Sequence, residues 1–268
     1  MVELIKFITE QKIKFYILGG GSNILFNDDG FEGIVIKLST NSNNKFGDIE
    51  TETLQNIGSK EDKNIECIYC GAAVSLAYLA RYTVEQGLSG LEYFSCIPGT
   101  VGGAIYGNAG VKNHDISSVL KEVEIIDYMG VKQTLTKDKI HFEYRKSNLK
   151  DCIITKAKFI LKKADKNDIL QIVLKEQENR KKNQPFGTKN AGCIFKNPLN
   201  DSAGRIIDSL NLKNFSIGDA EISNKHANFF INKKNASATD MLKLINFVQN
   251  EVYKKYKIKL EMEIKIVK

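Results

Sequence analysis

The stretch KFYILGGGSN (Lys14–Asn23) decides the fold class. Its aromatic and aliphatic first half predicts a buried strand, and Gly19, Gly20 and Gly21 follow directly, before Ser22 and Asn23. One or two glycines would suffice for a tight turn. Three leave a main chain without Cβ atoms, which can approach a ligand closely and direct its N–H groups at a pyrophosphate. The spacing is that of neither a Rossmann motif nor a P-loop, so it predicts phosphate binding without naming the nucleotide.

A second glycine-rich segment, IPGTVGGAIYGNAG (Ile97–Gly110), follows a predicted amphipathic helix. Two such loops, each after a regular element, could hold one elongated diphosphate cofactor from two sides. Around them, predicted helices and strands are interleaved, and the strands often come in adjacent pairs. This order predicts an α+β fold in preference to a doubly wound parallel sheet.

Composition narrows the class of protein. The chain has 268 residues and a formal charge of +7, but its lysines are scattered and form no basic stripe interleaved with aromatics. We therefore expect no nucleic-acid partner, although a local basic cluster could hold an anionic small molecule. No apolar run approaches the ~18 residues of a membrane span, and glutamates interrupt the N-terminal apolar pattern, unlike a signal peptide. A cytoplasmic location is expected.

Five cysteines, an odd number without regular spacing, argue against a disulfide framework. Cys67 and Cys70 form a C-x-x-C pair in a predicted strand, where residues three apart point to opposite faces, so strand packing is favoured over zinc or redox chemistry. We expect no metal site. Cys193, in NAGCIFKNP (Asn190–Pro198), stands between a small-residue turn and a short apolar strand. From these residues alone it could be a buried plug, a metal ligand, a nucleophile or an acid.

One long segment lacks a clear pattern. Residues 39–64 are polar and irregular. The segment could hold a short edge strand, and is otherwise expected to be a flexible surface insertion.

Five segments in order carry a family resemblance: ILGGGSNILFNDDGFEGIVIKL, GLSGLEYFSCIPGTVGGAIYGNAG, FEYRKS, AGCIFKNP, and KHANFFIN with the later LEMEI. Together they resemble the UDP-N-acetylenolpyruvoylglucosamine reductase (UDP-N-acetylmuramate dehydrogenase) family, FAD enzymes of peptidoglycan precursor synthesis. The resemblance implies a two-subdomain FAD-binding fold of the vanillyl-alcohol-oxidase/PCMH type with a C-terminal α+β substrate-binding domain. The expected parts are 1–40, 41–180 and 181–268, and the last strand could pack back on the FAD domain.

The resemblance also implies a reaction. A hydride passes from NADPH through bound FAD to the enolpyruvyl group of UDP-N-acetylglucosamine enolpyruvate, giving UDP-N-acetylmuramate. The partners would be these small molecules, and the protein a monomer without membrane insertion. The residues expected to hold FAD are Gly19, Gly20, Gly21, Ser22, Asn23, Ser95, Ile97, Pro98, Gly99, Thr100, Gly102, Gly103, Asn108 and Ile154.

Three residues match the family's catalytic positions. Arg145 in YRKS would face the substrate carboxylate, where a planar guanidinium suits the developing enolate charge. Cys193 stands where the family usually has the proton-donating serine. An unperturbed thiol, with a pKa of ~8.5, is mostly protonated at neutral pH and is a stronger acid than an alcohol. It can therefore donate the proton, although it is larger and oxidisable.

Glu263 in LEMEIK matches the third position, the family's C-terminal glutamate. Glu261 lies two residues away on the same face of a strand, so the spacing alone cannot choose between the two. The side chains expected at the substrate are Tyr144, Lys181, Lys182, Lys196, Asn197, His226 and Asn228. Asn183 occupies a position before QP that is often basic in the family, which leaves the diphosphate contact open.

The chain also departs from the family pattern. Met1 opens almost directly on the first helix, so the expectation is either that the given start is late or that the first FAD-binding subdomain is shortened. The short segment after Arg145 indicates the type II subclass, and VKNHD (111–115) replaces a more usual sequence near the flavin. Two alternatives are another FAD oxidoreductase of the same fold, and a degenerate homologue that binds a nucleotide sugar without catalysis.

Overall fold

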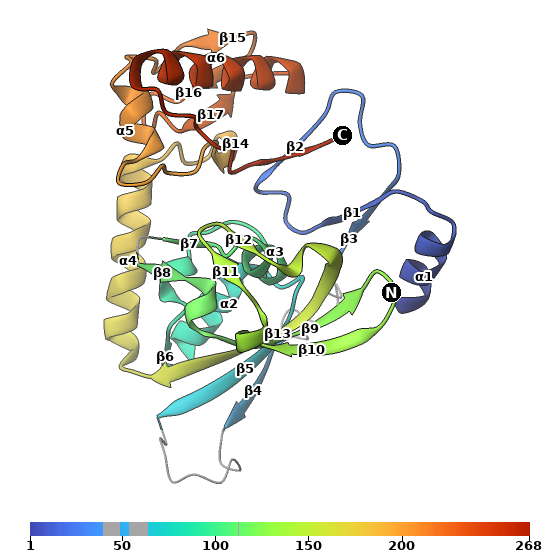
Figure 1. Cartoon of the computed structure of the whole chain (residues 1–268). Coiled ribbons are helices and arrows are strands. Elements are labelled where there is room, and N and C mark those ends of the chain that lie inside the picture. Colours follow the sequence, from blue (N-terminus) through green and yellow to red (C-terminus); the bar gives the residue numbers. More distant parts are fainter. Residues whose placement is uncertain (40–48, 54–63, 112) are drawn as a thin grey trace. The chain divides into compact units, whose positions relative to one another are not determined.

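The structure, a computed structural model, describes residues 1–39, 49–53, 64–111 and 113–268 (Figure 1). The chain divides into two compact units. Unit 1 comprises Met1–Gly20 and Gly33–Gln177, and unit 2 comprises Gly21–Glu32 and Glu178–Lys268. The expected insertion over residues 39–64 lies mostly outside the described residues.

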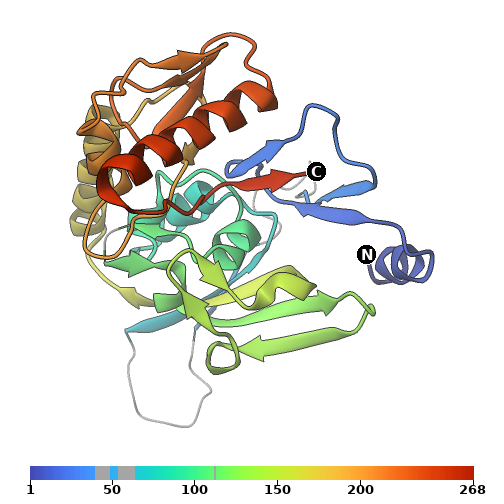
Figure 2. The ribbon, with the colours of Figure 1, turned by 45° about the horizontal axis from the view of Figure 1, so that its top comes forward.

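The centre of unit 1 is an antiparallel sheet with the strand order β10-β9-β13-β5-β4, to which β6 adds by pairing with the end of β13. Its strands are β4 (Ile49–Thr53), β5 (Ile65–Gly71), β6 (Leu88–Ser89), β9 (Leu120–Asp127), β10 (Lys132–Thr136) and β13 (Cys152–Lys163). The long β13 lies between β9 and β5 (Figure 2). Strand β4 ends the sheet, which confirms the short edge strand expected within the polar segment.

Two helices pack on one face of this sheet, α2 (Leu76–Glu85) and α3 (Val101–Tyr106). Ser75 caps α2 by accepting a hydrogen bond from the Tyr78 N–H, and Thr100 caps α3 by accepting one from the Gly103 N–H, as helix N-termini require. The apolar stripes of the two helices and one face of the sheet form the largest core. Its members include Ile68, Cys70, Leu76, Leu79, Ala80, Val101, Ile105, Val123, Ile125, Ala157, Phe159 and Leu161.

The first residues of the chain cover part of the opposite face. Helix α1 (Val2–Glu10) is followed by β1 (Phe15–Leu18), which pairs in parallel with β3 (Ile34–Lys37). Ile5 and Ile8 of α1 are fully buried, and they pack in one cluster with residues of β3, β9 and β13. This apolar cluster attaches the N-terminal segment to the sheet.

Short elements connect these layers. They are η1 (Glu92–Phe94), β7 (Gly110–Val111), β8 (His114–Asp115), η2 (Ile116–Ser118), η3 (Lys137–Lys139), β11 (Phe142–Glu143), β12 (Lys146–Ser147) and η4 (Leu149–Asp151). Helix α4 (Lys166–Asn183) follows β13, and the division between the units falls within it.

Unit 2 contains a four-stranded antiparallel sheet of order β14-β17-β16-β15. Its elements are β14 (Lys189–Cys193), α5 (Ala203–Asp208), β15 (Ser216–Ile217), β16 (Ala220–Ile222), β17 (Phe229–Asn232) and α6 (Ala238–Tyr256). Ile206, Leu244 and Phe230, from α5, α6 and β17, are fully buried in one core.

The loop Gly21–Glu32 belongs to unit 2 because two contacts hold it there. Its strand β2 (Ile24–Phe26) pairs in parallel with the last strand, β18 (Lys265–Val267). The Asp28 carboxylate accepts hydrogen bonds from the Ala238 N–H (2.6 Å) and the Thr239 N–H (2.8 Å), so it caps the N-terminus of α6. These bonds lower the pKa of Asp28, the largest cause being the hydrogen bond from the Thr239 hydroxyl.

The interleaved helices and antiparallel strands confirm the predicted α+β class. Among the described residues, every helix is too short or too polar to cross a membrane.

Candidate functional site

The two glycine-rich loops meet within unit 1. A Cβ atom at Gly19 would stand 2.7 Å from Oγ1 of Thr100, and one at Gly20 would stand 2.8 Å from Cα of Gly99. Both distances are too short for a real Cβ atom, so the first loop approaches the Thr100 side chain and the Gly99 main chain as closely as only glycine allows. The loops predicted to share one cofactor are therefore neighbours, although they lie far apart in the sequence.

The rest of the second loop is fixed by main-chain bonds. The Gly102 N–H donates to the Ala72 carbonyl at 2.8 Å, and a Cβ at Gly102 would stand 2.9 Å from that of Ala72. Upstream, the Ile97 N–H donates to the Phe94 carbonyl at 2.9 Å, and Ser95 is buried. The loop is a rigid surface on which a flat or extended ligand could lie against backbone.

Two expected cofactor residues have structural contacts. The buried Asn108 amide donates to the Glu143 carbonyl at 3.0 Å, and its oxygen accepts from the Ser117 N–H at 3.4 Å. The Ile154 side chain is buried in the large core, beside a register shift in β13 at Thr155. Neither side chain is presented to solvent, so any contact of Ile154 with a cofactor would come from its main chain.

Arg145 occupies the turn of the β11–β12 hairpin, whose registers Phe142↔Ser147 and Glu143↔Lys146 leave Tyr144 and Arg145 as the two turn residues. The φ angle of Arg145 is 57°, a left-handed conformation that usually favours glycine. Its Nη2 donates to the Gly110 carbonyl at 2.8 Å. Tyr144 is half-exposed, and the guanidinium carbon lies 5.0 Å from its ring centroid.

Two further bonds attach this hairpin to the end of α3. Asn108 donates to the Glu143 carbonyl, and the Ser147 hydroxyl donates to the Tyr106 carbonyl at 2.8 Å. Helix α3 begins at the glycine contact and has six residues, which corresponds to a rise of about 9 Å. It therefore connects the paired glycine loops to the support of Arg145 within unit 1.

In unit 2, Cys193 and Glu263 lie on hydrogen-bonded neighbouring segments. Cys193 is the last residue of β14, and the next residue, Ile194, accepts a hydrogen bond from the Glu263 N–H at 2.8 Å. A β-bridge joins Phe195 to Met262. Both Cys193 and Glu263 are half-buried. The main chains that carry the expected proton donor and the expected glutamate are thus paired.

Glu261 and Glu263 differ in their surroundings. Glu261 is exposed, and its carboxylate accepts from Nζ of Lys196 at 2.6 Å, while its carbonyl accepts from the Lys196 N–H at 2.8 Å. Glu263 is the less exposed of the two, and its carbonyl accepts from the Asn23 amide at 3.1 Å. The structure thus separates two residues that the sequence left equivalent, since Glu261 is exposed and paired with Lys196 while Glu263 is half-buried.

Asn228 and His226 support the segment after Cys193. Asn228 is 1% exposed, and its side chain both accepts from the Phe195 N–H (2.9 Å) and donates to the Phe195 carbonyl (2.8 Å). The His226 ring accepts from the Asn228 N–H at 3.2 Å and fills the space beside Gly204. Burial, and next the positive charge of Lys213, lower the pKa of His226. Through these contacts Asn228 and His226 hold the segment that follows Cys193 in place.

The remaining expected substrate residues occupy two places in unit 2. Asn197 accepts from the Ala203 N–H at 3.0 Å, at the start of α5. Lys181 and Lys182 are exposed in the last turn of α4, and the Lys181 carbonyl accepts from Nζ of Lys225 at 3.1 Å. The lysines complement the negative end of the helix dipole, and as exposed cations they give this part of the surface a local positive charge.

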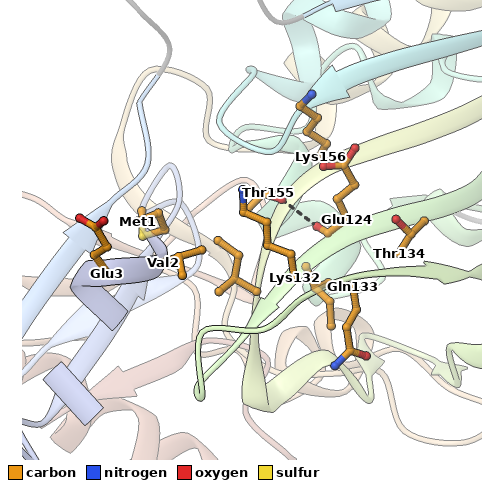
Figure 3. Close-up of a pocket in the computed structure, with 11 residues that line it drawn as sticks. Met1, Val2, Glu3, Glu124, Lys132, Gln133, Thr134, Thr155 and Lys156 are labelled. Carbon is orange, nitrogen blue, oxygen red and sulfur yellow. Dashed lines mark hydrogen bonds between the residues drawn. The ribbon is translucent and has the colours of Figure 1, made fainter. Parts of the chain in front are cut away.

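A cavity of about 640 Å³ lies in unit 1 between the start of α1 and the strands β9, β10 and β13 (Figure 3). Its polar walls include Glu124, Lys132 and Thr155, and the Thr155 hydroxyl donates to the Glu124 carbonyl at 3.1 Å. The predicted site residues are not among those that line it, although Thr155 follows Ile154 directly.

The five cysteines all lie within the described residues, and none is joined in a disulfide. Cys67 and Cys70 are buried in β5, which confirms that they pack in a strand. The described part of the chain contains no group of three or more His, Cys, Asp or Glu residues arranged to hold a metal ion.

Some supporting contacts carry no sequence signal. Asn108 was expected at the cofactor, but its bond to the Arg145 hairpin, like those of Gly110 and Ser147, arises only on folding. The stacked rings of Tyr93 in η1 and His114 in β8 likewise join residues of different elements. The segment VKNHD at residues 111–115, which departs from the family sequence beside a predicted glycine-rich loop, was a weak indication of these contacts.

Comparison with known proteins defines the class first. Residues 1–136, which include both glycine loops, match the family model of an FAD binding domain, so the chain carries the fold of FAD-dependent flavoproteins. Residues 184–267 match the model described as UDP-N-acetylenolpyruvoylglucosamine reductase, C-terminal domain. The chain belongs to the UDP-N-acetylenolpyruvoylglucosamine reductase family.

Relatives match along nearly the whole chain. It is 36% identical to the UDP-N-acetylenolpyruvoylglucosamine reductase of Halalkalibacterium halodurans, over 98% of this chain and 82% of that protein. It is 40% identical to the reductase of Pelagibacter ubique, over 99% and 85%. The crystal structure of the reductase from Thermus caldophilus superposes with a TM-score of 0.82 at 35% identity, covering 100% of this chain and 90% of that one. These matches confirm the predicted family and the two-part FAD-binding architecture.

Proposed function

We propose that this chain reduces the enolpyruvyl group of UDP-N-acetylglucosamine enolpyruvate with NADPH and FAD, and releases UDP-N-acetylmuramate for peptidoglycan synthesis. Family membership over nearly the whole chain supports the reaction. One structural observation carries the proposal further: the Glu263 N–H donates to the carbonyl of Ile194, the residue after Cys193, at 2.8 Å. This bond pairs the main chains of the proton donor and its acidic neighbour.

The chain's residues fit an FAD cofactor. A Cβ atom at Gly19 or Gly20 would collide with the Thr100 hydroxyl or with Cα of Gly99, so the two glycine loops can adjoin and present main chain to one ligand only because these residues are glycines. In our proposal these four residues, with Gly102, lie against the dinucleotide. When bound, FAD accepts the hydride of NADPH and delivers it to the enolpyruvyl double bond.

Arg145 binds the carboxylate of the enolpyruvyl group in this proposal. Addition of a hydride to the double bond moves negative charge toward that carboxylate, and a fixed guanidinium stabilises the charge as it develops. The φ angle of 57° at Arg145 supports this role, because residues in sparsely populated conformations cluster at functional sites.

Cys193 gives its thiol proton to the carbon next to the one that receives the hydride, and the remaining thiolate regains a proton from solvent. Glu263 lies on the paired segment and assists this proton transfer. Lys196, oriented by Glu261, binds the sugar portion together with Asn197. His226 and Asn228 contribute by holding the Cys193 segment.

The remaining assignments follow from the same proposal. Lys181 and Lys182, exposed on α4, bind the diphosphate. Residues 1–40 and 41–180 form the two FAD-binding subdomains, and 181–268 the substrate-binding domain. The protein acts as a monomer in the cytoplasm, where NADPH and UDP-sugars are available.

Purified protein tests the proposal. We expect a yellow protein with a flavin spectrum that oxidises NADPH rapidly when the enolpyruvyl sugar is present and slowly when it is absent. A colourless protein that FAD cannot reconstitute would favour the degenerate homologue. NADPH oxidation at one rate with and without the sugar would favour another flavin oxidoreductase.

A further inference from the structure

An aromatic stack outside the described site supports the strand next to Arg145. The rings of Tyr93 and His114 are parallel within 10°, with centroids 3.6 Å apart. Tyr93 lies in η1, beside Glu92, whose carboxylate is 2% exposed and accepts from the Ser89 hydroxyl at 2.8 Å and from the Gly90 N–H. Because a buried carboxylate fixes the turn that carries Tyr93, the tyrosine ring is a firm support.

The stack continues through β8 to β7. His114 pairs with Val111, and Asp115 pairs with Gly110, in a two-stranded hairpin. A Cβ at Gly110 would stand 2.8 Å from Cα of Asp115, so the two strands are in closest contact there. The carbonyl of this same Gly110 accepts from Nη2 of Arg145 at 2.8 Å. The acceptor that orients the guanidinium is therefore placed by the strand that His114 anchors.

We propose that Tyr93 and His114 are positioning residues for Arg145. The inference rests on the proposed function, because it assumes that Arg145 binds the substrate carboxylate. A guanidinium presents its donors in a rigid plane, so the bond to Gly110 fixes the direction of the whole fork. Loss of the stack would let β7 shift, and a displacement of about 1 Å at a positioning group can cost roughly 10²-fold in rate.

Three variants separate positioning from general stability. His114→Ala removes the stack, and His114→Phe keeps a ring that can stack on Tyr93. Phe215→Ala is the matched control, since it removes a stack of the same kind, with Phe247 at 4.5 Å, from unit 2. The FAD content and the melting temperature of each variant show that it is folded.

The measurement compares two ligands of the FAD-loaded protein. UDP-N-acetylglucosamine enolpyruvate carries the carboxylate, and UDP-N-acetylglucosamine lacks it. For His114→Ala we expect about a tenfold loss of affinity for the first ligand and less than about a twofold loss for the second, since a hydrogen bond to a charged group contributes about 1.5 kcal/mol or more. The quantity compared is the ratio of the affinity for the enolpyruvyl sugar to the affinity for UDP-N-acetylglucosamine. His114→Phe should restore this ratio to within about threefold of wild type, and Phe215→Ala should leave it unchanged.

The inference is overturned if His114→Ala leaves the affinity ratio unchanged, whether it weakens the binding of both ligands equally or of neither. It is also overturned if His114→Phe lowers the ratio as much as His114→Ala does. Should His114→Ala fail to fold, Tyr93→Leu, which also removes the stack, gives the same comparison. A wild-type protein that does not turn over the enolpyruvyl sugar contradicts the proposed function. A wild-type protein that turns it over, with an unchanged ratio in His114→Ala, contradicts only the positioning role.

Discussion

Arg145 and Cys193 are both expected at the reacting group, yet the chain holds them in different ways. The Arg145 hairpin is fastened through side chains, by Asn108, Ser147 and the guanidinium itself. Cys193 ends a strand, and the main chain beyond it is paired with Asn228 and Glu263. A residue held in place by side chains is sensitive to substitution of those side chains elsewhere in the sequence. A residue held in place by main-chain hydrogen bonds tolerates substitution of its own side chain.

The largest expected effect on activity comes from Cys193. Cys193→Ala removes the proton donor while the strand bonds remain, so we expect kcat to fall by about 10²–10⁴-fold, the usual contribution of a general acid. Steady-state assays with NADPH and the enolpyruvyl sugar measure it, and reduction of the flavin by NADPH alone should persist.

The matched control for this position is Cys193→Ser, which replaces the thiol with the smaller hydroxyl donor usual in the family and should retain substantial activity. Full turnover by Cys193→Ala would remove Cys193 from the mechanism.

Arg145→Gly tests the other half of the comparison. The backbone φ of 57° costs an arginine roughly 1–2 kcal/mol that a glycine is spared, while the lost bond from the charged guanidinium to Gly110 was contributing about 1.5 kcal/mol. We therefore expect kcat to fall about 10²–10³-fold with a melting temperature within about 4 °C of wild type.

Lys12→Gly is the matched control for Arg145→Gly, because Lys12 is exposed in unit 1 with a φ of 53° and should leave kcat unchanged. A large fall in the melting temperature of Arg145→Gly, with activity retained, would show that Arg145 serves the fold.

Asn228→Ala should act on stability. It leaves the N–H and the carbonyl of the buried Phe195 without their side-chain partner, which costs about 2–4 kcal/mol of the free energy of unfolding. Denaturant titration measures this loss. The exposed Asn167→Ala should change the free energy by less than about 0.5 kcal/mol. Equal stability of the two variants would contradict the scaffold described for the Cys193 strand.

The smallest expected effect is a change in folding stability at acid pH. Because its hydrogen bonds to α6 lower the pKa of Asp28 in the folded state, this carboxylate contributes stability above the unfolded value of about 4, and the contribution is lost as the pH falls through the folded value. Asp28→Asn should therefore be less stable than wild type at neutral pH, and the two should converge below about pH 4. Unfolding titrations at both pH values test this, with the exposed Asp29→Asn as control. A difference that stays constant with pH would contradict it.

Much of the fold could be predicted because its signals are local. The segment KFYIL predicted a strand that ends at the glycines, and β1 (Phe15–Leu18) ends there. The predicted approach of these glycines to a ligand stays a prediction; what the structure shows is that Gly20 approaches Gly99 of the second loop. The edge strand in the polar segment was also predicted, and β4 lies there. The resemblance allowed the last strand to pack back on the FAD domain but named no partner strand. The pairing of β18 with β2 in particular could not be predicted, because parallel pairing of two three-residue strands at opposite ends of the chain leaves no periodic signal.

Site residues could be predicted only where the residue type itself, such as a guanidinium, a thiol or a carboxylate, suits the chemical step. Arg145, Cys193 and Glu263 came from their motifs, and their roles stay predictions. Spacing could not separate Glu261 from Glu263, because their different exposure and the ion pair of Glu261 with Lys196 arise only on folding. Asn108 and Asn228 were expected at the cofactor and the substrate, and these roles stay predictions. Their bonds to the main chain of other segments could not be predicted, because they depend on tertiary contacts.

The central claim is that this chain adds a hydride and a proton to an enolpyruvyl UDP-sugar. The most direct measurement is the mass of the sugar recovered after reaction of the FAD-loaded protein with NADPH and UDP-N-acetylglucosamine enolpyruvate. The account predicts one molecule of UDP-N-acetylmuramate, heavier than the substrate by two hydrogen atoms, for each NADPH oxidised. Recovery of the sugar at its original mass while NADPH is consumed would contradict it.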